Sequence, residues 1–191
     1  MIGPVLFTAV LLALTSLQYD FMIGIGWRPL ADPSGAWPSG LALGPYGSAQ
    51  VANFVISGFL LALFAVGLHL GVREARGSQY GTALLVAAGV LIALMGFETD
   101  PIRRVGPRSW HGMIHDAAFV LFVFAFLAAL FLLWRRFEAD PLWQNHARYT
   151  LLTGVLAMLL LLLPGVAYYL FVATLLAWIE VSALRLWRLR L

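Results

Sequence analysis

The residues of this chain that could carry out chemistry are concentrated between positions 96 and 116, in the stretch GFETDPIRRVGPRSWHGMIHD. His111 and His115 stand four residues apart, so both imidazoles lie on one face of a helix, as in helical zinc sites. Asp100, or alternatively Glu98, could supply a third, oxygen ligand from the end of the neighbouring helix. A bound water would then be activated to attack an ester, amide or phosphate. The pattern predicts a divalent metal such as zinc, held by His111, His115 and Asp100.

Three further side chains are candidates for the chemistry itself. Glu98 and Asp116 are acid/base candidates, and Ser57 could orient the attacking water or the substrate. Position 112 is Gly, so the adjacent Glu of the zinc-protease motif HExxH is absent. The alternative is a structural one, in which the two histidines hydrogen-bond to acidic side chains such as Asp20 and hold helices together.

The chain that carries this stretch is strongly apolar. Of its 191 residues 62% are hydrophobic and only 11% are charged, whereas a soluble domain carries about 25% charged residues. It has no cysteine, which excludes disulfides and thiolate metal sites. The net charge of +3 comes from arginines that flank apolar runs, which excludes a nucleic-acid partner. We therefore expect a multi-pass protein of the prokaryotic inner or plasma membrane, with membrane lipids as partners and a homo-oligomer as a further possibility.

A membrane-spanning helix needs about 20 mostly apolar residues, and six segments of the chain qualify. They run roughly over 3–24, 48–71, 80–98, 110–134, 147–164 and 167–187. The expected fold is an all-α bundle of six transmembrane helices in a single domain, residues 1–191. With both termini cytoplasmic, only Arg28, Arg103, Arg104 and Arg108 of the twelve arginines lie outside, and this excess of inner arginine favours that orientation.

In this topology four helices bring polar groups to the same outer level of the membrane. The groups are Tyr19 and Asp20 on the first helix, Gln50, Asn53 and Ser57 on the second, Glu98 and Asp100 after the third, and His111, His115 and Asp116 on the fourth. Ionisable groups at membrane depth are costly unless they face partners or water. The convergence predicts a polar pocket that opens outward, with Tyr19, Asp20 and Asn53 in its wall. The loop at 27–46 lies on the same side, either as a lid or as an ordinary surface loop.

Two stretches resemble a known family. PSGLALGPYGSAQVANFVISGFLL and GFETDP…WHGMIHDAAFVLF are similar to the outer loop, second helix and F-x-x-D…H-G-x-x-H element of the prokaryotic six-helix membrane family known as domain of unknown function 998. The last helix, LLPGVAYYLFVATLLAW, matches that family only loosely. The resemblance implies a fold and topology without an activity, and it places Asp100, His111 and His115 on the family's polar motif.

A more distant likeness extends to seven-helix membrane hydrolases such as the alkaline ceramidases, which hold zinc with Ser, Asp and three His. Ser57, Asp100, His111 and His115 would fill analogous roles, although a third histidine at that depth is missing. The leading hypothesis is a metal-assisted hydrolase of a lipid-like substrate. The alternatives are a non-catalytic membrane protein that binds a lipid or partner in the same pocket, a haem-binding redox protein that uses His69 and His146, and a small transporter.

Overall fold

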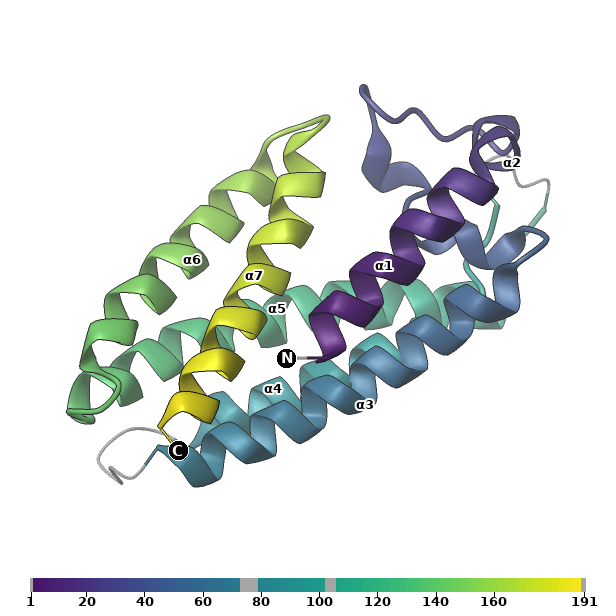
Figure 1. Cartoon of the computed structure of the whole chain (residues 1–191). Coiled ribbons are helices and arrows are strands. Elements are labelled where there is room, and N and C mark those ends of the chain that lie inside the picture. Colours follow the sequence, from purple (N-terminus) through teal and green to yellow (C-terminus); the bar gives the residue numbers. More distant parts are fainter. Residues whose placement is uncertain (1, 73–78, 102–105, 190–191) are drawn as a thin grey trace.

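The computed structural model describes residues 2–72, 79–101 and 106–189, and its regular elements in these ranges are helices (Figure 1). The α-helices are α1 (Ile2–Leu17), α2 (Tyr19–Gly24), α3 (Gly47–Gly71), α4 (Tyr80–Leu94), α5 (Trp110–Ala139), α6 (Gln144–Leu162) and α7 (Ala167–Arg188). Two short 3-10 helices, η1 (Pro33–Gly35) and η2 (Ser39–Leu43), lie in the loop between α2 and α3. Five of the arginines that set the expected orientation fall outside the described residues, namely Arg73, Arg76, Arg103, Arg104 and Arg190.

Four of the helices are long and apolar enough to cross a membrane. These are α3, α5, α6 and α7, with 25, 30, 19 and 22 residues. Helices α1 and α4 are equally apolar but shorter, with 16 and 15 residues. At a rise of about 1.5 Å per residue, each of these two falls short of a hydrocarbon core that is about 30 Å thick. The chain is therefore a helical membrane protein by length and composition.

The ends of two helices differ from the predicted segments. The first segment, 3–24, is divided at Gln18 into α1 and α2. The Gln18 side chain is buried and forms hydrogen bonds with the loop before α3. Its amide donates to the Leu41 carbonyl, and its carbonyl accepts from the Tyr46 N–H. Helix α4 ends at Leu94 instead of 98, because the chain turns there and carbonyls of the turn accept a hydrogen bond from another helix.

Consecutive helices pack side by side from α3 onward: α4 lies between α3 and α5, and α6 lies between α5 and α7 (Figure 1). The backbones of α3 and α4 approach each other closely at Gly58 and Gly89. A Cβ built on Gly58 would lie 2.3 Å from the Gly89 carbonyl oxygen, and one built on Gly89 would lie 2.5 Å from that of Gly58. Such small-residue contacts let helix backbones meet where lipid offers no hydrophobic driving force.

The loop from 25 to 46 contacts α1, α7 and the α6–α7 turn at one end of the bundle, which we call the loop end. The Trp37 ring packs edge-on against Tyr169, with centroids 4.9 Å apart, and its indole N–H donates to Thr15. The α6–α7 turn also reaches this loop, since a Cβ on Gly165, whose φ is +66°, would lie 3.0 Å from the Leu30 carbonyl oxygen. At the opposite end Arg136 of α5 donates to carbonyls at the C-terminus of α3.

Candidate functional site

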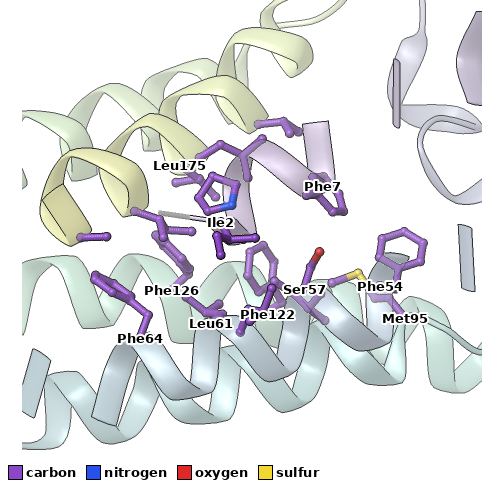
Figure 2. A pocket seen from close by; sticks show the side chains of 18 of the residues that line it. Ile2, Phe7, Phe54, Ser57, Leu61, Phe64, Met95, Phe122, Phe126 and Leu175 are labelled. Atoms are coloured by element: carbon purple, nitrogen blue, oxygen red, sulfur yellow. The ribbon is translucent and has the colours of Figure 1, made fainter. Parts of the chain in front are cut away.

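A large cavity of about 580 Å³ lies between α1, α3, α5 and α7 and is partly open at the surface, where Ile2, Leu63 and Trp187 line it. Its walls are formed almost entirely by apolar side chains, as Figure 2 shows for Phe54, Phe64, Phe122 and Phe126. A polar exception is Ser57, whose hydroxyl is labelled in the same view. The volume falls within the roughly 300–1,000 Å³ of typical small-molecule sites. The cavity is long: its lining includes residues of the loop end and residues of the last turns of α7.

A second cavity of about 120 Å³ lies at the loop end and has a different character. Polar side chains of the loop, of the segment after α4 and of α5 line it: Ser34, Ser39, Thr99, Asp100, His115 and Asp116. At the rim, Arg108 forms an ion pair with Asp116 at 2.9 Å, and both side chains are about half exposed, at 59% and 46%. This small cavity therefore offers hydrogen-bonding groups close to solvent.

The two cavities adjoin each other. Ser39, Phe119 and Tyr168 line both of them. An apolar chamber and a polar chamber thus share a wall at the loop end, and Ser39 and Tyr168 are the hydroxyl-bearing residues among those that line both. The combined shape suits a molecule with one long apolar part and one small polar part.

His115 is the best-fixed histidine of the predicted site. Its side chain is 4% exposed, and its Nδ1 lies 2.9 Å from the carbonyl oxygens of both Met95 and Phe97. These carbonyls belong to the turn that ends α4, so the imidazole satisfies groups that the helix leaves unpaired. Its Nε2 lies 2.8 Å from the hydroxyl oxygen of Ser39. His115 therefore ties α5 both to α4 and to the loop.

His111 and Asp100 make separate contacts. The Nδ1 of His111 lies 2.9 Å from the backbone carbonyl oxygen of Glu98 and 3.0 Å from the Ser109 hydroxyl. Asp100 accepts a hydrogen bond from the Ser109 backbone N–H at 3.1 Å, and the Ser109 side chain caps α5 by accepting from the Gly112 N–H. These contacts fix the start of α5, where the first N–H groups lack helical partners.

The predicted metal ligands do not form a common ligand set. Among residues 2–72, 79–101 and 106–189, no three His, Asp or Glu side chains are grouped so that they could hold a metal ion. Both ring nitrogens of His115 contact protein groups, as described above. The metal site of His111, His115 and Asp100 stays a prediction, which metal analysis of the purified protein tests.

The other predicted site residues are spread over three places. Asp116 lines the small cavity, and Ser57 lines the large one. Asn53 lies beside Ser57 on α3, where its amide donates to the Phe7 carbonyl and its carbonyl accepts from the Ser57 hydroxyl at 3.5 Å. The remaining three, Tyr19, Asp20 and Glu98, are exposed and line neither cavity.

The histidines of the haem alternative have different partners. His69 Nδ1 lies 3.2 Å from the Thr82 hydroxyl, between α3 and α4, and the buried His146 contributes its Nε2 to a 2.8 Å contact with the Ser182 hydroxyl. Each histidine thus joins its own pair of helices.

None of the three residues at the junction of the cavities is among the predicted site residues, and Ser39 is the one of them that contacts a predicted residue, His115. Ser39 lies 76 positions before His115, in a loop without regular periodicity. The available signal was indirect: the loop was expected on the same side as the polar groups, and Ser39 is one of its few hydroxyl-bearing residues.

Comparison with known proteins gives a family and no activity. Neither the curated proteins nor the solved structures contain a match to this chain. The family model described as "Protein of unknown function (DUF998)" matches residues 1–186, and the chain belongs to that family.

Proposed function

We propose that this protein binds a single-chain amphipathic lipid. The hydrocarbon chain occupies the large cavity and the polar head occupies the small one. The observation that carries this proposal is the shared wall of the two cavities at Ser39, Phe119 and Tyr168. A single apolar chamber adjoins the polar one, which favours a ligand with one chain over a ligand with two.

The polar cavity favours an uncharged head. Two carboxyl groups line it, those of Asp100 and Asp116, and the single described arginine beside them, Arg108, is already paired with Asp116. A head that brings a further negative charge therefore gains less there than a neutral head with hydroxyl groups.

A hydroxyl-bearing head can instead donate hydrogen bonds to these carboxyl oxygens and to the hydroxyl oxygens of Ser34 and Ser39, whose own hydrogens face Asp32 and His115. The proposed ligand class is therefore a neutral monoacyl lipid, such as a monoacylglycerol.

We propose further that the protein resides in the cell membrane with six spanning helices and both termini in the cytoplasm. In this arrangement α2 lengthens α1, and the turn at residues 95–97 lengthens α4. The loop end, with the polar cavity, then lies at the outer face. The ligand enters from the outer leaflet.

The length of the lipid's hydrocarbon chain should affect its binding affinity. A hydrocarbon chain gains little by leaving lipid tails for an apolar cavity, so affinity must come from the fit of the chain and from hydrogen bonds of the head. We expect an optimum chain length rather than tighter binding with every added methylene.

Photo-crosslinking in lipid nanodiscs tests the binding proposal. The probe is a monoacylglycerol with a diazirine in its chain, and labelled peptides are mapped by mass spectrometry. We expect labels on cavity residues such as Leu61 and Phe126, and competition by unlabelled monoacylglycerol. Labels confined to the outer faces of the helices would contradict the proposal.

A matched pair of glycine variants sharpens the test. Gly67 lines the large cavity, and a Cβ on it would meet only Leu186 at 3.5 Å, so Gly67→Leu fills the cavity without disturbing the backbone. Gly24, at the end of α2, has nothing within 4 Å and serves as the control. We expect Gly67→Leu to lower cavity labelling several-fold and Gly24→Leu to leave it unchanged.

A further inference from the structure

The contact between Ser39 and His115 has the arrangement of a nucleophile with its general base. The Ser39 hydroxyl oxygen lies 2.8 Å from His115 Nε2, within the distance at which a base can take a hydroxyl proton. Ser39 is half-buried at the start of η2, and His115 is buried in α5. The two residues come from elements far apart in the chain.

The surroundings of His115 fix the tautomer that such a base requires. Carbonyl oxygens only accept hydrogen bonds, so a nitrogen that bonds to the Met95 and Phe97 carbonyls must carry the hydrogen. The hydrogen therefore resides on Nδ1, and Nε2 presents its lone pair to the Ser39 hydroxyl. In serine hydrolases a carboxylate gives the histidine this orientation; here two backbone carbonyls supply it.

The position of Ser39 matches the position of an ester bond in the proposed ligand. Ser39 lines both cavities, so its hydroxyl lies where a chain in the apolar chamber would join a head in the polar one. In a monoacyl ester that junction is the acyl carbonyl. On the basis of the proposed lipid binding, we propose that Ser39 and His115 are a catalytic pair that hydrolyses a neutral monoacyl ester.

The reaction balances with water as the co-substrate. Ser39 Oγ attacks the ester carbonyl carbon while His115 Nε2 takes the hydroxyl proton. The carbon–oxygen bond to the alcohol then breaks, the alcohol leaves with the proton from Nε2, and the acyl group remains on Ser39. Water from the small cavity gives a proton to Nε2 and attacks the acyl carbon. Ser39 leaves with that proton, and a fatty acid is released.

An active-site-directed probe tests the pair directly. Protein in nanodiscs is treated with a long-chain alkyl fluorophosphonate, which modifies activated serine hydroxyls, and the modified residue is identified by mass spectrometry. Hydrolysis of a monoacylglycerol is measured in parallel by fatty-acid release. We expect an adduct on Ser39. We also expect a loss of hydrolysis of at least roughly 100-fold in Ser39→Ala, because this variant lacks both the nucleophile and the proton that the general base takes.

Two controls separate catalysis from structure. Ser48 lies at the start of α3, is exposed and lines neither cavity, so Ser48→Ala should keep both adduct and hydrolysis. His115→Ala removes the bonds that close α4 and could fail to fold, so His115→Asn, which retains an N–H donor for the carbonyls, is made beside it. We expect His115→Asn to fold, to crosslink the lipid probe and to lose the Ser39 adduct.

The outcomes distinguish this inference from the binding proposal. Cavity crosslinking without a Ser39 adduct and without hydrolysis above Ser39→Ala would overturn the catalytic pair and leave lipid binding intact. A Ser39 adduct with no crosslink in the large cavity would place the chain elsewhere and overturn the binding proposal. Hydrolysis that persists in Ser39→Ala and is lost on metal chelation would overturn the pair in favour of metal chemistry.

Discussion

At the scale of single residues, Gly112 shows how closely the start of α5 is packed. A Cβ on Gly112 would lie 2.6 Å from a carboxylate oxygen of Asp100, the group that accepts the Ser109 N–H. Gly112→Ala must displace this carboxylate, at a cost of about 0.5–2 kcal/mol for the lost helix-capping contact and about 1–3 kcal/mol for overpacking. Together these exceed the gain of about 1 kcal/mol from replacing a helical Gly with Ala.

Thermal unfolding in detergent measures the effect. We expect a melting temperature several degrees lower for Gly112→Ala. The matched control is Gly154→Ala in α6, where the nearest atoms to a Cβ are 3.5 Å away and only the propensity gain remains. A Gly112→Ala protein as stable as Gly154→Ala would show that Asp100 has no role in holding the start of α5.

Sequence patterns locate the polar residues of the site but not the pairs they form. The convergence of polar groups from four helices predicts a pocket, and Asp100, His115 and Asp116 do line one small cavity. The predicted metal site depends on the four-residue spacing of His111 and His115. This spacing indicates that the two imidazoles share a helix face, but it does not indicate which groups lie opposite them. In the structure the partners of His115 are backbone carbonyls and Ser39, and backbone carbonyls leave no signature in a sequence.

At the scale of elements, the α3–α4 contact depends on two glycines. The Cβ of Gly58→Ala or Gly89→Ala would meet backbone atoms, which cannot rotate away as a flexible side chain can. We expect each variant to lose about 1–3 kcal/mol of stability through forced separation of the helices. The double variant should lose less than the sum, because helices already separated by one methyl group accommodate the second.

Unfolding of the four proteins of this double-mutant cycle, with Gly67→Ala as control, measures the coupling. Gly67 is on the same helix, but a Cβ there would meet only the side chain of Leu186 at 3.5 Å. Strict additivity of Gly58→Ala and Gly89→Ala would contradict a direct contact between the two positions. Losses no larger than that of Gly67→Ala would show that the two helices do not pack through these glycines.

Hydropathy predicts the helices better than it predicts their ends. The starts of α4, α5 and α7 fall at the first residues of their predicted segments, because loops rich in Pro, Gly and charge precede them. The division of the first segment at Gln18 could not be predicted, because the bonding partners of Gln18 lie 23 and 28 residues further along the chain. From the sequence alone, a polar residue inside an apolar segment is compatible with a helix that ends there and with a continuous helix in which its side chain bonds to a neighbouring turn.

At the scale of the whole molecule, the number of spanning helices decides on which side of the membrane each loop lies. Three helices, α3, α4 and α5, separate Ser48 from Asn145, and both residues are exposed. If all three helices span, Ser48 and Asn145 face opposite sides. If the short helix α4 does not span, they face the same side. The side of Asn145 relative to Ser48 therefore separates the six-span topology from one in which only the four longest helices cross.

Single-cysteine labelling can determine both sides, because the natural chain has no cysteine and each variant carries one thiol. We expect a membrane-impermeant maleimide to label Ser48→Cys in intact cells and to label Asn145→Cys only after the cells are permeabilised. The reverse pattern would invert the orientation and place the loop end, with Ser39 and His115, at the cytoplasmic face. Labelling of both in intact cells would show that α4 does not cross, and the polar groups at its C-terminus would then lie on the opposite side from the start of α3.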